Sequence, residues 1–176
     1  MSSRPELKLD WCGHDAAKYA VEHWHYSECL PAGKLLKVGV WEAGLFIGAV
    51  IFSRGANNNL GRPFSLAQVE IAELTRIALT KHCAPVTRIV SIAFQFLRKN
   101  SPGLRLIVSY ADPLKGHHGG IYQGGGMDLL RCITTPARSN ARWGCDAQAD
   151  SERIVWNHKR HDEISHHVET QIPHAA

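Results

Sequence analysis

The sequence of 176 residues lacks a long hydrophobic run, and its cysteines are not spaced as in common metal or redox motifs. Its longest apolar stretch, Ala43 to Phe52, is too short to cross a bilayer as a helix. The first thirty residues are rich in charge and hold no apolar segment of the kind that secretion signals carry. The five cysteines show no C-x-x-C spacing, which argues against common zinc and redox motifs and favours reduced thiols. We therefore expect a cytoplasmic protein without membrane contact.

Apolar residues are also scarce in the last fifty residues. Leu, Ile, Val and Phe make up 8 residues of 127–176, or 16%, against 35 residues of 1–126, or about 28%. A content below about 20% makes a stable core doubtful. The net charge is +5 in the first part (14 Lys and Arg, 9 Asp and Glu) and −1 in the second (6 and 7). We divide the chain into a domain over 1–126, whose charge permits a nucleic-acid partner, and a divergent or poorly ordered tail over 127–176.

Hydrophobic periodicity predicts an α/β (α+β) fold, with a mixed central β-sheet flanked by helices. We expect strands over 7–11, 36–41, 45–52, 69–79 and 104–110, helices over 14–24 and from Pro85 to the turn at Pro102, and a short helix or turn over 116–126. Strict alternation over 69–79 places Ile71 and Leu79 on one strand face and Arg76 on the other. A helix between two strands predicts a parallel pair. No regular element is assigned after Met127.

Chemically active side chains follow the strand over 104–110. Asp112 comes directly after it, and sites in such sheets form at the carboxyl ends of strands. Ten residues later, Tyr122 is placed for its phenol to return to that strand end and protonate a leaving group. The adjacent His117 and His118, flanked by glycines, are candidate metal ligands. Structural alternatives stay open for all of them: Asp-Pro begins many turns, a tyrosine fits a core, and adjacent side chains rarely point the same way.

Three further polar residues stand in apolar surroundings. His25 and Tyr26 follow the first predicted helix beside Trp24, where a partly buried aromatic cluster is the structural alternative. Arg76 shares its predicted strand face with Ala72 and Ala78. An arginine among apolar neighbours must pair with a carboxylate or lie at a site, and both interpretations remain.

Together these motifs resemble the Mom proteins of Mu-type phages and prophages. The blocks that carry the resemblance lie at 25–27, 39–42, 48–52, 73–79, 85–91, 102–113 and 116–123. They cover roughly residues 20–125. The most specific part is Ala-Asp-Pro at 111–113 together with Gly-His-His-Gly-Gly-Ile-Tyr-Gln at 116–123.

The resemblance implies a domain like the GCN5-related N-acetyltransferases. Its implied activity converts N6 of adenine in phage DNA to a carbamoylmethyl (acetamido) derivative, which shields the DNA from host restriction enzymes. DNA and a small-molecule donor are then the partners, in the host bacterial cytoplasm. An iron requirement is a further expectation, with His25, His117 and His118 as candidate ligands. The resemblance places five residues in the active site, namely His25, Tyr26, Arg76, Asp112 and Tyr122.

The chemistry of adenine suggests a role for each of these five residues. The N6 lone pair is delocalised into the ring, so a base should take its proton during attack, and Asp112 is the candidate. Arg76 would hold a developing anion or a phosphate. Tyr122 would protonate the departing donor, while His25 and Tyr26 would seat the base or help bind a metal. In duplex DNA the target would have to be flipped out of the stack.

The sequence departs from the family pattern at two places. Acetyltransferases usually wrap the donor pyrophosphate with a glycine-rich loop before a helix, but residues 80–85 hold no glycine. The candidates that remain for an acyl-CoA-like donor are the helix-start amides and the charges near them, namely Lys81, Val86, Thr87 and Arg88. The family also continues with an aromatic strand where this chain reads Gly126-Met127-Asp128-Leu129. One hypothesis is a shifted reading frame from about Gly126, which would leave an inactive copy.

Two alternatives to DNA modification follow from these departures. The first is an acyl-CoA-dependent N-acyltransferase that acts on a small molecule or protein, against which the missing glycine loop argues. The second is a non-enzymatic DNA-binding module or an inactive family copy.

Overall fold

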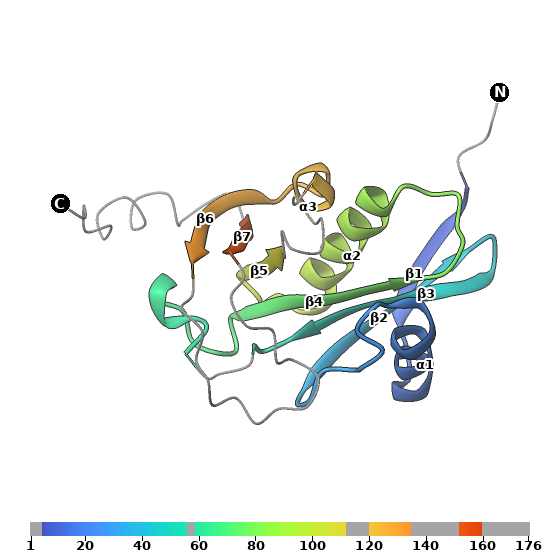
Figure 1. Ribbon diagram of the computed structural model, residues 1–176, viewed down its shortest axis with the longest axis horizontal. Coiled ribbons are helices and arrows are strands. Elements are labelled where there is room, and N and C mark those ends of the chain that lie inside the picture. Colours follow the sequence, from blue (N-terminus) through green and yellow to red (C-terminus); the bar gives the residue numbers. More distant parts are fainter. Residues whose placement is uncertain (1–4, 56–58, 112–119, 135–151, 160–176) are drawn as a thin grey trace.

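The structure is a computed structural model that describes residues 5–55, 59–111, 120–134 and 152–159. Seven strands form one sheet in the order β1-β2-β3-β4-β5-β7-β6 (Figure 1). The strands are β1 (Leu7–Trp11), β2 (Leu35–Glu42), β3 (Leu45–Ser53), β4 (Ile71–Leu79), β5 (Leu106–Ala111), β6 (Asp128–Thr134) and β7 (Glu152–Lys159). The helices are α1 (His14–Trp24), α2 (Val86–Asn100) and the short α3 (Gly120–Gly124), together with a 3₁₀ turn, η1 (Arg62–Phe64).

The sheet is mixed, as the sequence predicts. Strands β1 to β4 pair antiparallel with their neighbours in chain order, and α2 then crosses over so that β5 lies parallel to β4. Beyond β5 the pairing returns to antiparallel through β7 and β6. The α+β architecture expected from the strand and helix order is therefore confirmed.

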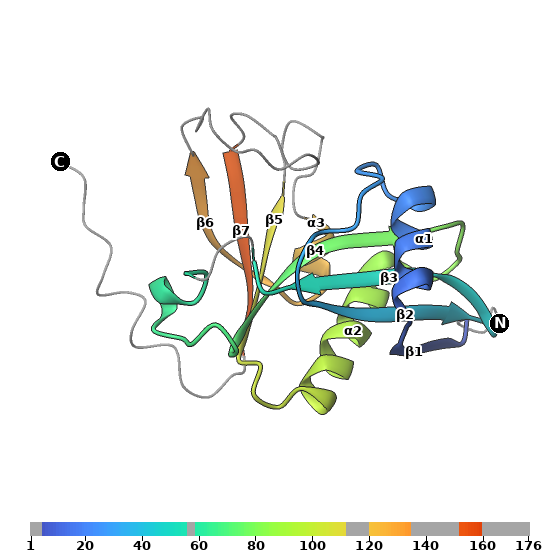
Figure 2. The same ribbon diagram turned by 90° about the horizontal axis from the view of Figure 1, so that it is seen from below.

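Helices cover both faces of the sheet, α1 on one and α2 on the other (Figure 2). Alternate residues of β3 show why, since Val50 and Phe52 pack in the cluster of α2, whereas Ala49 and Ile51 pack in the cluster of α1. All four side chains are fully buried. Burial on both faces explains why β3 is continuously apolar rather than alternating. None of the helices in the described ranges is long and apolar enough to cross a membrane.

Strand β4 contains a β-bulge at Thr75. Its register with β3 pairs Ile51 with Arg76 but Phe52 with Leu74, so Thr75 is an extra residue, and its hydroxyl donates to the Ile51 carbonyl at 3.1 Å. The bulge shifts the alternation of the strand. Leu74 packs with the α2 cluster before the bulge, and Ile77 packs with it afterwards.

Two expectations about β4 are therefore wrong. The first is that Ile71 and Leu79 share one face. In the structure, Ile71 packs with Leu106 and Val108 of β5, whereas Leu79 packs in the cluster of α2. The second is that Arg76 shares its face with both Ala72 and Ala78. Ala72 packs with α2 and Ala78 with α1, so the bulge places Arg76 on the α1 side with Ala78.

The strands β4 and β5 separate after a short parallel contact. Their pairing runs from Ile71 opposite Leu106 to Leu74 opposite Ser109 and ends there, although β4 continues to Leu79. Figure 2 shows β5 turning away from the direction of β4. The sheet therefore opens next to the bulge, between two strands whose backbones are fixed on their other sides by β3 and β7.

Element boundaries differ from expectation where side chains are exposed. Strand β4 begins at Ile71 rather than Val69, because Val69 is 61% exposed and the Glu70 amide closes a turn onto the Ala67 carbonyl. Strand β5 begins at Leu106 rather than Leu104. The amides of Arg105 and Leu106 both donate to the Glu70 carbonyl, which joins the two strand starts.

The last fifty residues supply two strands where the sequence analysis assigns none. Strand β7 pairs with β5 over residues 106–111, and β6 pairs with β7. Backbone pairing with an open sheet edge needs no apolar periodicity, so it can overrule a weak local pattern. The division of the chain at residue 126 and the hypothesis of a shifted frame stay predictions.

Candidate active site

A pocket of about 300 Å³ lies at the opening between β4 and β5. Strand β4 supplies its residues 74–77 and 79, the end of α1 supplies Trp24, and β5 supplies Tyr110. The pocket brings together four of the five predicted active-site residues, namely His25, Tyr26, Arg76 and Tyr122. These four come from three different parts of the sequence, so their gathering results from the fold rather than from sequence proximity.

Tyr122 enters the pocket from α3. Burial raises the pKa of its phenol above the ordinary value, a hydrogen bond with the Ser109 side chain lowers it, and the nearby Tyr26 and Glu73 raise it further. Ser109 is fully buried, and its hydroxyl donates to the Leu74 carbonyl at 3.1 Å, at the last parallel pair of β4 and β5. A phenol in these surroundings stays protonated at neutral pH, as a proton donor must.

A glycine sets how closely α3 packs on α2. A Cβ added at Gly124 would lie 2.6 Å from Cγ2 of Thr87, so only glycine allows this approach without movement. The C-terminal end of α3 is also tied down, because the amides of Gly125 and Met127 donate to the carbonyls of Ile121 and Tyr122, respectively. The residues that follow Tyr122 are thus held by the packing of Gly124 on Thr87 and by two backbone hydrogen bonds, one of which is accepted by the Tyr122 carbonyl.

His25 and Tyr26 occupy the turn that ends α1. The Ser27 amide donates to Nδ1 of His25 at 3.1 Å, which places an acceptor lone pair on Nδ1 and the proton of the neutral imidazole on Nε2. The rings of His25 and Tyr26 lie 4.3 Å apart with a 32° tilt. Tyr26 is 60% exposed and lines the pocket.

Arg76 brings positive charge to the pocket from β4. Its Nη1 donates to the Thr75 carbonyl at 2.9 Å, next to the bulge that turns this residue to the α1 side. The apolar side chains of Leu74, Ile77 and Leu79 line the same pocket. A guanidinium among apolar walls is suited to stabilising a negative charge that develops in a reaction.

The predicted phosphate-binding residues differ in their contacts. Val86 lines the pocket, whereas Lys81 is not among its lining residues. Thr87 lies against Gly124, and the Arg88 guanidinium donates to the Pro5 carbonyl at 3.0 Å.

Sequence reasoning missed Glu42, whose carboxylate lies just before α2. Its Oε2 accepts the Cys83 amide at 2.9 Å and its Oε1 accepts the Ala84 amide at 2.7 Å. The Cys83 hydrogen bond is the largest cause that lowers the pKa of this carboxyl, with smaller contributions from Ala84, His82 and Arg88, while desolvation raises it. Glu42 belongs to the family-like block at 39–42, which was the available signal, but no local pattern connects it to a loop forty residues later.

Asp112, His117 and His118 lie outside the described residues. Within the ranges that the structure describes, no group of three His, Cys, Asp or Glu side chains is arranged to hold a metal ion. No observation therefore supports the expectation of iron, and the role of Asp112 as base remains a prediction.

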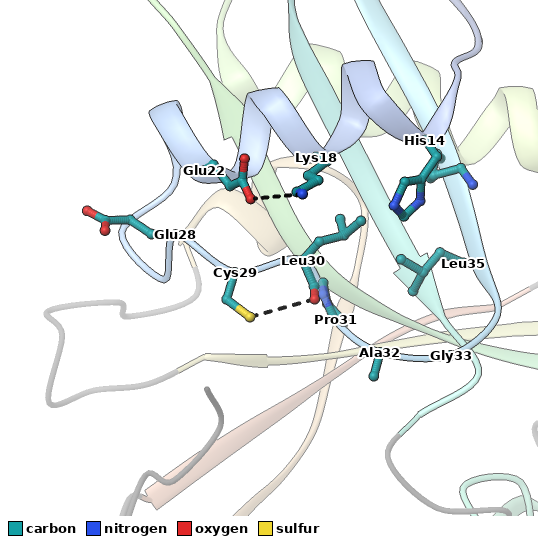
Figure 3. A pocket seen from close by; sticks show the side chains of 11 residues that line it. His14, Lys18, Glu22, Glu28, Cys29, Leu30, Pro31, Ala32, Gly33 and Leu35 are labelled. Carbon is teal, nitrogen blue, oxygen red and sulfur yellow. Dashed lines mark hydrogen bonds and ion pairs between the residues drawn. The ribbon is translucent and has the colours of Figure 1, made fainter. Parts of the chain in front are cut away.

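A second pocket of about 410 Å³ lies between α1 and the segment that follows it (Figure 3). Lys18 and Glu22 of α1 form an ion pair of 3.7 Å at its wall, and Cys29 points its thiol toward the Leu30 carbonyl across from them. The lining mixes both signs of charge and includes none of the predicted active-site residues. This pocket does hold titratable side chains, among them His14, Glu28 and Cys29, but they belong to none of the blocks that carry the family resemblance.

Solved structures similar to this chain are N-acetyltransferases. One is an aminoglycoside acetyltransferase, AAC(6')-Ib, in complex with paromomycin and acetyl-CoA, with a TM-score of 0.60, 12% identity, and 88% of this chain and 94% of that chain covered. Another is aminoglycoside 6'-acetyltransferase type Ii, with a TM-score of 0.55, 12% identity and coverage of 86% and 96%. A third is the spermidine N-acetyltransferase from Vibrio cholerae with CoA and spermine, with a TM-score of 0.52, 10% identity and coverage of 87% and 95%.

These identities are low, so the likeness shows the fold alone, and that fold is the GCN5-related acetyltransferase fold expected from the sequence. No curated protein matches the chain. The model of the Mom protein family matches residues 6–175, which extends past the blocks quoted above and through the tail. The chain therefore belongs to the Mom protein family.

Proposed function

We propose that this chain is a transferase that attaches a carbamoylmethyl (acetamido) group to N6 of adenine in DNA and so protects phage DNA from host restriction in the bacterial cytoplasm. Membership of the Mom family supports the reaction class. The observation that carries the proposal is the pocket at the β4–β5 opening, where a partly buried phenol, a guanidinium, an imidazole and an exposed aromatic ring meet.

The reaction is a group transfer from an activated small-molecule donor to an amine. A new bond forms between N6 and the carbon of the transferred group, and the bond between that carbon and the leaving atom of its carrier breaks. N6 loses one proton to a base, for which Asp112 is the candidate, and the leaving atom gains one proton. No electrons are exchanged with another reactant, so the step needs neither an oxidant nor a metal to balance.

Tyr122 is the proposed proton donor to the leaving atom. Its raised pKa keeps the phenol protonated until the leaving atom develops negative charge. Arg76 is the proposed stabiliser of that charge, and its partly buried position would strengthen the interaction. His25 is the proposed positioning residue for Tyr26, because its ring is held by Ser27 and lies 4.3 Å from the Tyr26 ring.

Tyr26 is the proposed platform for the target base. Adenine inside a duplex hides N6 in the stack, so the base must turn out and be held by new contacts. Stacking of a base on an aromatic ring contributes about 1–3 kcal/mol and needs an exposed ring face. Tyr26 is 60% exposed at the pocket, whereas Tyr122 is partly buried, and the resulting desolvation raises its pKa.

Expression of the chain in a bacterium tests the proposal. Total DNA is digested to nucleosides, and deoxyadenosine is examined by mass spectrometry for the added carbamoylmethyl mass. Tyr122→Phe should abolish the adduct, whereas Tyr19→Phe, which changes an exposed tyrosine of α1, should leave it unchanged. If the folded, soluble chain yields no heavier deoxyadenosine, the proposed function is wrong.

The second candidate function is N-acylation of a small-molecule or protein amine with acyl-CoA. The fold favours it, since similar structures are acetyltransferases in complex with CoA or acetyl-CoA. Release of CoA from acetyl-CoA in the presence of an amine acceptor, without any DNA adduct, would support this candidate over DNA modification.

A further inference from the structure

The amides that precede α2 are engaged by the chain's own carboxylate. Acetyltransferases are expected to bind the donor pyrophosphate at this junction, and helix starts with free amides attract anions. Here Glu42 receives both the Cys83 and the Ala84 amide, at 2.9 and 2.7 Å. The junction also lacks glycine, and two of its backbone amides, those of Cys83 and Ala84, are already committed to an internal anion.

The position of Glu42 is fixed by the sheet rather than by a mobile loop. Glu42 ends β2 opposite Leu45, and the next residue, Ala43, adopts a left-handed backbone conformation (φ 50°) and donates its amide to the Glu6 carbonyl at 3.0 Å. Strands on both sides therefore hold the carboxylate in front of α2. Its movement to admit another anion would break two hydrogen bonds from backbone amides.

Two basic side chains, His82 and Arg88, surround the Glu42 carboxylate. His82 and Arg88 lie near enough to Glu42 to act on it electrostatically. The Arg88 guanidinium is also bound to the Pro5 carbonyl, and Thr87 is packed on Gly124. A diphosphate placed here would bring further negative charge beside Glu42 and would compete with it for the Cys83 and Ala84 amides.

We propose that Glu42 is an internal substitute for a donor diphosphate, so that this chain discriminates against CoA and takes an activated donor whose carrier bears no diphosphate at the start of α2. The implied acyl-CoA cofactor therefore does not fit the residues present at this junction. The inference rests on the proposed function for the identity of the transferred group, but its central statement concerns binding and can be measured without catalysis.

Calorimetric titration of the full chain with CoA, acetyl-CoA and inorganic pyrophosphate tests this inference. The wild-type chain should show no saturable binding of CoA into the millimolar range. Glu42→Ala, which frees both amides and removes the charge, should bind CoA and pyrophosphate at least about tenfold more tightly. Glu42→Gln removes only the charge and retains an acceptor oxygen, so a smaller gain is expected.

The matched control is Glu70→Gln. Glu70 also accepts a backbone amide, that of Ala67, at 2.8 Å, but its other partner is Arg105 beside the β4 and β5 starts. This variant should bind CoA as weakly as the wild type. The melting temperatures of all variants identify any that fail to fold. If Glu42→Ala fails to fold, Glu42→Gln still tests the inference.

Two results would overturn the inference. One is micromolar binding of acetyl-CoA by the wild type with no gain in either Glu42 variant. The other is the absence of CoA binding in the wild type and in both folded variants, because Glu42 would then not be the determinant. If the wild-type chain forms no DNA adduct, the proposed function fails. The binding results for the Glu42 variants still decide this inference, so the two failures are distinguishable.

Discussion

At the residue scale, the protonation of Tyr122 makes the free energy of unfolding depend on pH, which can be measured. Its folded-state pKa is raised above the unfolded value, chiefly by burial. Stability from the protonated phenol is therefore fully present below the unfolded pKa of about 10 and is lost as the pH rises through the folded pKa. The residue that we propose as proton donor should thus limit alkaline stability.

We predict that the free energy of unfolding falls more steeply with pH above about pH 10 in the wild type than in Tyr122→Phe. Phenylalanine keeps the ring and removes the ionisable group. Chemical denaturation across this pH range measures the difference, with Tyr19→Phe as the control for an exposed tyrosine. Equal alkaline slopes in wild type and Tyr122→Phe would show that burial does not perturb this phenol.

Tyr26 gives a second prediction at this scale. Tyr26→Ala should weaken binding of a single-stranded oligonucleotide that contains adenine by roughly 5- to 150-fold, the loss expected for one stacking contact. Tyr26→Phe should bind nearly as well as the wild type, since the ring face is retained. Fluorescence anisotropy measures both affinities, and equal affinities for Tyr26→Ala and wild type would contradict a stacking role.

The same scale shows what the sequence could predict about the site. The motif blocks containing His25, Tyr26, Arg76 and Tyr122 pointed to residues that the fold brings to one pocket. Glu42 could not be predicted from the sequence, because its partners are backbone amides about forty residues away. Every residue except proline has such an amide, so no residue type marks the contact.

At the scale of elements, the contact between α2 and α3 determines where Tyr122 lies. Gly124→Ala would place a methyl group 2.6 Å from Cγ2 of Thr87, so α3 must move away from α2. We predict a marked loss of DNA modification in this variant. Thr87→Ser removes the obstructing methyl group and should restore modification in the double variant.

The control for this experiment is Gly120→Ala at the start of the same helix. A Cβ at Gly120 would meet no atom within 4 Å, so this variant should retain wild-type modification. Adduct yield per deoxyadenosine, measured for all four proteins at equal expression, gives the comparison. A double variant as inactive as Gly124→Ala alone would mean that close packing on Thr87 is not the reason for glycine.

Periodicity located the elements better than the faces of the strands. The helix over 14–24 and the strand over 7–11 have the predicted bounds, because their apolar spacing is regular. In β4 the bulge at Thr75 reversed the faces beyond it, and a period of two carries no sign of an extra residue when both faces are partly apolar. The pairing partner, not the strand itself, determines where a bulge falls.

At the scale of the whole molecule, the last fifty residues complete the sheet. Strand β7 covers the β5 edge over residues 106–111, and Met127 is 3% exposed in the core cluster of α2. Low apolar content predicts a separate tail over 127–176, and this division stays a prediction, because composition does not encode long-range strand pairing.

We predict that a chain truncated after residue 126 is less stable than the full chain and associates through the exposed β5 edge. Size-exclusion chromatography and thermal melting of the truncated and full chains measure this. A truncated chain that is monomeric and melts at the same temperature would show that residues 1–126 form an independent domain, as the charge and composition of the two parts suggest.

The most direct test of the account is the nucleoside mass spectrum of DNA from cells that express the full chain. The account predicts a deoxyadenosine heavier by the carbamoylmethyl group in cells with the wild type, and its absence with Asp112→Asn and with Tyr122→Phe. Unmodified deoxyadenosine in cells that contain the folded wild-type protein would contradict the account.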